Sequence, residues 1–282
     1  IHGEQANQMK GQLIDENRQE NTIVHEVFHH WFGNLVTSES WSNLALNESF
    51  ASYSEYLWRE HKYGKENADA HLFKAIKIYK DDKDNFDKTL VRFNYLDKED
   101  MFDAVSYNKG GAILHMLRNY VGDEAFFASL KKFLTDNQYK AAEVHQLRLT
   151  FEEVTGKDLN WFFNQWFYGS GHPKIQVSYD YNTLEKTVTI NFVQSQINEF
   201  KFPIAIDIYE NGQKIRHQVF VDARDTSFKF GFTSKSPDLI QVNADGVLLA
   251  DFYENKVLSD YIFQLKNVEA FVHKREALLE VA

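Results

Sequence analysis

The chain has 282 residues, a formal net charge of −10 and no cysteine. The missing cysteines exclude a disulfide framework, a cysteine-ligated zinc or iron–sulfur site and a cysteine nucleophile, so any metal site must use mainly His, Asp and Glu. The excess of 41 Asp and Glu over 31 Lys and Arg argues against sequence-independent binding of nucleic acid, which needs a basic surface. No apolar run approaches the ~20 residues of a membrane-spanning helix.

Residues 1–171 show the period of amphipathic helices. Apolar residues recur at intervals of three and four in three stretches: 113–120, 126–134 and 144–154. Each stretch predicts a helix with one buried face. Gly156 follows the third stretch as a C-cap candidate, and Asp158 is a candidate N-cap for a further helix that ends before Gly169.

The hydrophobic period changes after residue 171. Alternating apolar and polar residues predict strands in four stretches: 175–181, 188–192, 200–208 and 215–221. The Asn211-Gly212 pair between the last two is the dipeptide typical of a tight hairpin. Two shorter stretches, 228–230 and 239–242, add two short strands. These short strands predict a small β-sandwich over 172–252. The helical period returns near residue 259, so 253–282 are expected to open a C-terminal helical segment. The expected fold class is therefore multidomain α + β.

The candidate chemistry lies in the run HEVFH. Two histidines four residues apart on a helix project about 40° apart around its axis, so His25 and His29 face one side and suit two corners of a tetrahedral zinc site. Glu26 points in a neighbouring direction, from which it could reach a metal-bound water. No helix breaker interrupts residues 22–32, which predicts a helix there, with Gly33 as its C-cap candidate.

A zinc peptidase site needs a third protein ligand and an open fourth position. Glu48 is the candidate, with eighteen residues between it and His29. Asn47 is placed to cap a second helix whose buried stripe includes Phe50. Glu55 lies seven residues after Glu48 and so on the same helix face, where it could accept a hydrogen bond from a ligand imidazole. Asn47 and Glu55 are thus candidates to support the ligands; the alternative for Glu55 is a solvated carboxylate.

At these residues the sequence resembles a known family. The run HEVFHHWFGNLVT, followed by NESFASYSEYLW, resembles the aminopeptidase N family of zinc metallopeptidases, which includes the leukotriene A-type hydrolases. The family pattern is HExxHxWxGNxVT with a glutamate ligand after an eighteen-residue spacer, and every defining position is met. The resemblance implies one Zn²⁺ held by His25, His29 and Glu48, with Glu26 as the general base.

A second block extends the resemblance. The run VSYNKG resembles the family segment that carries the catalytic tyrosine, which implies that role for Tyr107; the alternative is a core aromatic at a helix start. The run WFFNQWFYGSGHP looks like the family's exit from its catalytic domain. The resemblance implies a mostly helical, thermolysin-like catalytic domain over 1–171, and it extends to 172–252 only in pattern.

One family element is missing from the 282 residues. The aminopeptidases carry a GxMEN motif before the catalytic helices, and its glutamate binds the free amine of the substrate. No such motif exists here, so we expect a fragment that begins just inside the catalytic domain, with the substrate-binding residues upstream of Ile1.

The resemblance implies a zinc aminopeptidase that releases N-terminal residues from peptides. A thermolysin-like zinc endopeptidase and an inactive scaffold with the peptidase fold are the alternatives. The expected partners are peptide substrates, with no nucleic acid and no transmembrane segment in this part of the protein, and a monomer is favoured. The chain does not specify the side-chain preference or the compartment, for which a bacterial periplasm or cytoplasm is the expectation.

Overall fold

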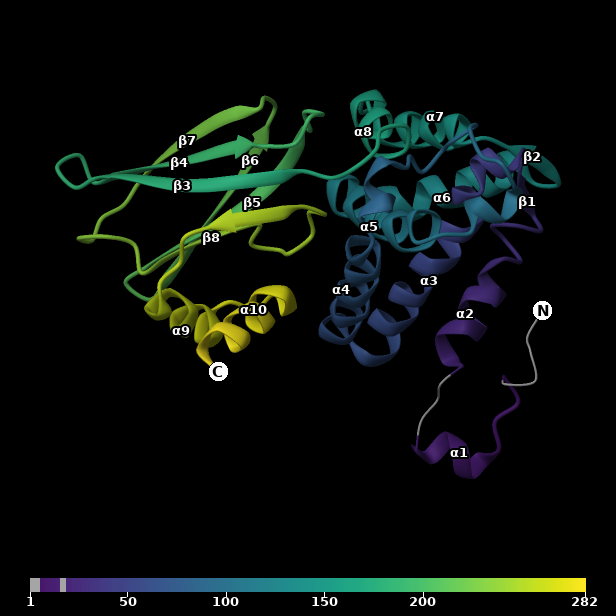
Figure 1. The fold of residues 1–282 in the computed structure, drawn as a ribbon, viewed down its shortest axis with the longest axis horizontal. Helices are drawn as coiled ribbons and strands as arrows, with labels where there is room; N and C mark the ends of the chain where they lie inside the picture. Colours follow the sequence, from purple (N-terminus) through teal and green to yellow (C-terminus); the bar gives the residue numbers. More distant parts are fainter. Residues whose placement is uncertain (1–5, 16–18) are drawn as a thin grey trace. The chain divides into compact units, whose positions relative to one another are not determined.

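The computed structural model describes residues 6–15 and 19–282 (Figure 1). The chain divides into two compact units, Ile1–Gly171 and His172–Ala282. In the described ranges, no helix combines the length and the apolar character needed to cross a membrane. The expected three-part layout, with a boundary at residue 252, stays a prediction.

The first unit is built mainly from helices. Its α-helices are α1 (Lys10–Asp15), α2 (Glu20–Phe28), α3 (Ala45–Tyr63), α4 (Lys65–Asp81), α5 (Gly110–Val121), α6 (Asp123–Asn137), α7 (Val144–Thr155) and α8 (Asn160–Trp166). Short 3₁₀ turns occupy η2 (Trp41–Asn43), η3 (Lys83–Asp87) and η4 (Lys98–Met101), and η5 (Val105–Lys109) is a single turn of π-helix. The two strands β1 (Val36–Ser38) and β2 (Lys140–Ala142) pair in parallel.

Helix α3 is the central element of this unit. It packs against α2, α4 and α5, and Figure 1 shows α2 and α4 on either side of it. The buried ring of Phe32 stacks on Phe50 of α3, with ring centroids 4.1 Å apart, and also on Phe28 and Phe133. These stacked rings join the end of α2 to the first turns of α3.

Three predicted helices are confirmed as α5, α6 and α7, and their predicted stripes are buried for the most part. Gly156 ends α7 in the left-handed conformation (φ +66°), as its position after the stripe predicts. The predicted N-cap, Asp158, lies one residue too early, because α8 begins at Asn160 and Leu159 occupies the N-cap position. The Asp158 carboxylate still accepts the Asn160 N–H at 2.9 Å, and α8 ends before Gly169, as predicted.

The predicted end of the helix over 22–32 is wrong, because α2 ends at Phe28. Beyond that residue the N–H groups of Asn34, Leu35 and Val36 donate to carbonyls five residues back, so the chain leaves the helix in wider turns. Gly33 is therefore not a helix C-cap. It has φ +149°, and its N–H donates to the Val36 carbonyl at 2.8 Å.

The predicted capping role of Asn47 is also wrong. Helix α3 begins at Ala45, so Asn47 lies inside its first turn. The 3₁₀ turn η2 leads directly into α3, and the carbonyl of Leu44 accepts the N–H groups of Asn47 and Glu48. Backbone carbonyls thus accept hydrogen bonds from N–H groups of the first turn that a side-chain cap would otherwise satisfy.

The second unit contains two sheets and two helices. Its strands are β3 (Lys174–Asn182), β4 (Thr187–Gln194), β5 (Phe202–Glu210), β6 (Gln213–Val221), β7 (Asp225–Gly231), β8 (Leu239–Val242) and β9 (Asp251–Glu254). They form the sheets β7-β4-β3-β9 and β6-β5-β8. Helices α9 (Leu258–Asn267) and α10 (Phe271–Val281) follow.

The hairpin predicted between β5 and β6 is confirmed. Asn211 and Gly212 both have positive φ, +51° and +73°, as a type I′ turn requires. Strand β9 was not predicted, because its residues do not alternate between apolar and polar; it pairs in parallel with β3. The rings of His217 on β6 and Phe230 on β7 lie 4.3 Å apart, so the two sheets touch there, and the sandwich layout stays a prediction.

Candidate metal centre

Three predicted ligand residues converge at the contact between α2 and α3. His25 comes from α2, His29 from its C-terminal cap, and Glu48 from the first turn of α3; one ligand atom from each lies within 4.8 Å of the others. The Glu48 Oε2 atom is 3.2 Å from Nε2 of His25 and 3.5 Å from Nε2 of His29. Two atoms about 2.0–2.2 Å from a tetrahedral zinc ion lie roughly 3.4 Å apart, so the spacing fits zinc.

The opposite nitrogen of each imidazole has its own partner. Nδ1 of His25 lies 3.2 Å from Oε1 of Glu55, and Nδ1 of His29 lies 3.0 Å from the carbonyl oxygen of Phe32. Both acceptors favour a proton on Nδ1, so each Nε2, which faces Glu48, is the nitrogen that would give up its proton to bind a metal ion. Two such imidazoles and one carboxylate form the donor set of a catalytic zinc site.

The electrostatics of the three residues favour a positive charge between them. Burial alone would lower the pKa of His25, but hydrogen bonds with Glu48 and Glu55 outweigh it and raise the pKa to about 9. Burial alone would raise the pKa of Glu48, but hydrogen bonds with His25 and His29 outweigh it and hold the pKa at about 2. Since the ligand atoms of a metal must be deprotonated, a metal ion that binds here displaces the protons on the two Nε2 atoms and leaves those on Nδ1.

Gly33 lies against His29. A Cβ atom at Gly33 would come within 2.8 Å of the His29 carbonyl oxygen and 3.4 Å of its Nδ1. The absence of a side chain lets the wide turns after α2 fold back on the helix, where the Phe32 carbonyl meets the imidazole. A side chain at position 33 would therefore disturb the orientation of the His29 imidazole.

Tyr107 lies beside the three ligands, on the π-helical turn η5. Its ring is nearly parallel to that of His25, with an interplanar angle of 12° and centroids 5.8 Å apart. Burial raises the pKa of Tyr107 above its ordinary range, and the carboxylates of Glu48 and Glu26 raise it further. The phenol therefore stays protonated at neutral pH.

The two residues predicted to support the ligands differ in their contacts. Glu55 contacts His25, as described above, and also His71 of α4, whose Nε2 lies 3.1 Å from Glu55 Oε2. Asn47 makes no described hydrogen bond with a ligand; its Oδ1 is buried without a hydrogen-bond partner in the described part of the chain.

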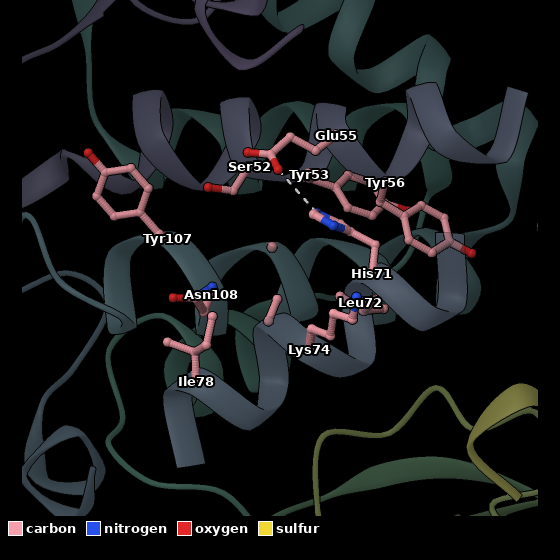
Figure 2. Close-up of a pocket in the computed structure, with 12 residues that line it drawn as sticks. Ser52, Tyr53, Glu55, Tyr56, His71, Leu72, Lys74, Ile78, Tyr107 and Asn108 are labelled. Carbon is pink, nitrogen blue, oxygen red and sulfur yellow. Dashed lines mark ion pairs between the residues drawn. The ribbon is translucent and has the colours of Figure 1, made fainter. Parts of the chain in front are cut away.

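A cavity of about 440 Å³ lies next to the centre (Figure 2). Glu55 and His71 line it from α3 and α4, and Tyr107 lines it from η5. The sequence offered no signal for His71, because its place beside Glu55 depends on how α4 packs against α3. Figure 2 shows the two side chains directed toward one another across the cavity wall.

Known proteins are similar to this chain in sequence. Residues 6–166 match the Peptidase family M1 domain. Tricorn protease-interacting factor F2 of Thermoplasma volcanium is 29% identical over 225 residues, which cover 77% of this chain and 29% of that protein. Aminopeptidase N of Lactococcus lactis is 34% identical over 194 residues, which cover 61% of this chain and 22% of that protein.

The fold is also similar to that of a solved structure, Legionella pneumophila aminopeptidase A in complex with aspartic acid. The TM-score is 0.78 at 22% sequence identity, over 93% of this chain and 30% of that one. The chain thus spans less than a third of the length of each of these proteins. Because the family match covers more than half of its residues, the chain belongs to peptidase family M1.

Proposed function

We propose that the chain carries the catalytic centre of a zinc-dependent aminopeptidase, which hydrolyses the N-terminal peptide bond of peptides. The observation that carries this proposal is the convergence of His25, His29 and Glu48, with both Nε2 atoms facing one carboxylate oxygen. Membership of family M1 and the similarity to an aminopeptidase N support the choice of peptides as substrates.

These three residues would hold the metal ion. Bound there, zinc would supply Lewis-acid chemistry: it polarises the scissile carbonyl group and lowers the pKa of water toward ~7. Glu55 and the Phe32 carbonyl orient the two imidazoles by accepting their Nδ1 protons. The stacked ring of Phe32 holds the carbonyl-bearing turn against α3.

Glu26 acts as the general base. It directly follows the candidate ligand His25 on α2, so its side chain projects in a neighbouring direction from the helix. In the proposed reaction the Glu26 carboxylate accepts a proton from the attacking water and delivers it to the leaving amine.

Tyr107 donates a hydrogen bond to the oxyanion that develops on the scissile carbonyl. Its raised pKa keeps the phenol protonated and hence able to donate. A donor aimed at a developing oxyanion contributes about 3 kcal/mol to the stabilisation of the transition state.

The experiment compares one peptide with a free and with an acetylated N-terminus, incubated with the zinc-loaded protein. An aminopeptidase releases the first residue of the free peptide and leaves the acetylated peptide intact. Internal cleavage of both peptides would instead identify a thermolysin-like endopeptidase. Zinc binding with no cleavage of either would identify an inactive scaffold.

A further inference from the structure

Glu55 lies between two histidines from different helices. Its Oε1 is 3.2 Å from Nδ1 of His25 on α2, and its Oε2 is 3.1 Å from Nε2 of His71 on α4. The pair of Glu55 and His71 is marked by the dashed line in Figure 2. Each carboxylate oxygen thus has its own imidazole, and the chain His71–Glu55–His25 links three helices to the candidate metal centre.

The carboxylate of Glu55 has room to move on one side. Its side chain is 18% exposed and lines the cavity of about 440 Å³. A glutamate side chain has several rotatable bonds, so a carboxylate held on one oxygen alone could turn into this space. Partners on both oxygens oppose that rotation, because any turn of the carboxylate breaks one of the two contacts.

We propose that His71 is a positioning residue of the metal centre, which holds Glu55 in the orientation that accepts the Nδ1 proton of His25. Through Glu55 it fixes the tautomer and the ring orientation of a zinc ligand, and it thereby raises the affinity of the site for zinc. The inference rests on the proposed function, since it requires zinc at His25, His29 and Glu48. His71 itself is not one of the three candidate ligands.

Burial and geometry support this role. The side chain of Glu55 is only 18% exposed, and each of its oxygens lies within hydrogen-bond distance of an imidazole nitrogen. A carboxylate that accepts the Nδ1 proton of His25 makes that imidazole a stronger ligand. Without His71, one oxygen of this largely buried carboxylate would lose its partner, at a cost typical of an unsatisfied buried charge.

The test is the zinc affinity of the purified chain, measured by competition with a chromophoric chelator. His71→Leu removes the donor to Glu55 and is expected to weaken zinc binding 10- to 100-fold, the usual effect of losing an outer partner of a metal ligand. His71→Gln is expected to retain most of the affinity, because its amide nitrogen takes a place similar to that of Nε2. His71→Asn is too short to reach that place and should behave like His71→Leu.

Two controls separate positioning from a general loss of structure. His61→Leu removes an exposed histidine at the end of α3 and should leave the zinc affinity unchanged. In a Glu55→Ala background, His71→Leu should weaken zinc binding no further, because the residue through which it acts is gone. Thermal unfolding of each variant with excess chelator reports on the fold without the metal.

The outcomes distinguish this inference from the proposed function. Equal zinc affinities of the parent chain and of His71→Leu would overturn the inference and leave the proposed centre intact. The inference would also be overturned if His71→Leu weakened zinc binding as much in the Glu55→Ala background as in the parent chain, since His71 would then act by another route. A parent chain that binds no zinc would overturn the proposed centre, and the inference with it.

Discussion

The hydroxyl of Ser49 donates a hydrogen bond to the backbone carbonyl of Ser106, with an oxygen–oxygen distance of 2.7 Å. Both residues are buried, and 57 positions separate them in the sequence. Ser49 directly follows the candidate ligand Glu48, and Ser106 directly precedes Tyr107. One hydrogen bond therefore ties the helix turn that carries a metal ligand to the π-helical turn that carries the proposed oxyanion donor.

Replacing Ser49 by alanine is expected to lower kcat with little change in zinc affinity. The substitution removes the hydrogen bond to the Ser106 carbonyl, at a cost of about 0.5–1.5 kcal/mol, and loosens η5 on α3. Steady-state kinetics should show a loss of kcat larger than any rise in KM. Ser54→Ala is the matched control, because Ser54 is also a buried residue of α3 whose hydroxyl bonds to a carbonyl, that of Ala51 in its own helix. An equal loss of kcat in both variants would argue against a specific link to Tyr107.

Ser49 also lies close to Gly110, and we therefore expect alanine to change stability in opposite directions at Gly110 and at its neighbour Gly111. A Cβ atom at Gly110 would lie 2.0 Å from the Ser49 hydroxyl oxygen, whereas at Gly111 the nearest atom, the Tyr53 nitrogen, would be 3.8 Å away. Gly110→Ala is thus expected to force η5 and α5 away from α3 and to lower the midpoint of urea unfolding. Gly111→Ala should be neutral or stabilise by about 0.5–1 kcal/mol, because alanine favours a helix over glycine.

A double variant tests the cause of the Gly110 effect. Ser49→Gly removes the side chain that the new methyl group would meet, so Gly110→Ala should cost less in that background than alone. If the double variant lowered the unfolding midpoint by the sum of the two single effects, the close approach to Ser49 would not be the reason for glycine at position 110.

The sequence predicted the convergence of the three candidate ligands better than the contacts around them. His25, His29 and Glu48 were found because helical spacing sets the direction of the two imidazoles, and because the family pattern supplied the third ligand. His71 and the pair of Ser49 and Ser106 were out of reach, since their contacts depend on how α4 and η5 pack against α3. Such packing leaves no periodic signal in a single sequence.

Local backbone detail was also beyond the sequence pattern. The apolar stripes of α5, α6 and α7 were visible because each helix buries one face over several turns. The early end of α2 was not, because the wide turns after Phe28 use residues that would equally suit a helix. Strand β9 was missed because its two apolar residues are adjacent and show no alternation; its place beside β3 comes from the pairing of the two strands.

Glu26→Gln tests the proposed base. The amide cannot accept the proton of the attacking water, so kcat should fall by about 10²–10⁴-fold. The zinc content measured by elemental analysis should stay that of the parent, because Glu26 is not one of the three ligands. Glu66→Gln on α4 makes the same chemical change at an exposed position and should keep the parent rate. A Glu26→Gln protein with normal turnover would refute the assignment.

Tyr107→Phe tests the proposed oxyanion donor. Removal of one such donor typically lowers kcat by about 10²–10³-fold, and KM should change far less because the interaction develops only in the transition state. The ring itself stays, so its stacking on His25 is retained. Tyr139→Phe, at a residue 84% exposed, is the control for the loss of a phenolic hydroxyl and should keep the parent kcat. An unchanged kcat for Tyr107→Phe would make Tyr107 a structural aromatic.

We expect the buried Lys109, at the end of η5, to make the free energy of unfolding depend on pH. The residue is fully buried, and its Nζ has no hydrogen-bond partner among the described residues; the ring centroid of Tyr79 lies 5.7 Å away. Burial, with a smaller effect of the Arg92 charge, lowers the pKa of Lys109 to about 7 from its ordinary 10.5. Between these values the unfolded chain holds a proton that the folded chain has released, so the free energy of unfolding rises with pH over this window.

Lys109→Met is expected to remove that rise and to stabilise the chain at pH 7 by roughly 1–4 kcal/mol, because an apolar side chain of similar length needs no hydrogen-bond partner. Urea unfolding at several pH values between 7 and 9.5 measures both effects, and the difference between parent and variant should shrink as the pH rises. Lys131→Met, at an exposed position of α6, should change stability by less than about 0.5 kcal/mol. A parent and a Lys109→Met variant with parallel pH profiles would mean that Lys109 stays charged in the folded chain and is stabilised by contacts beyond those described.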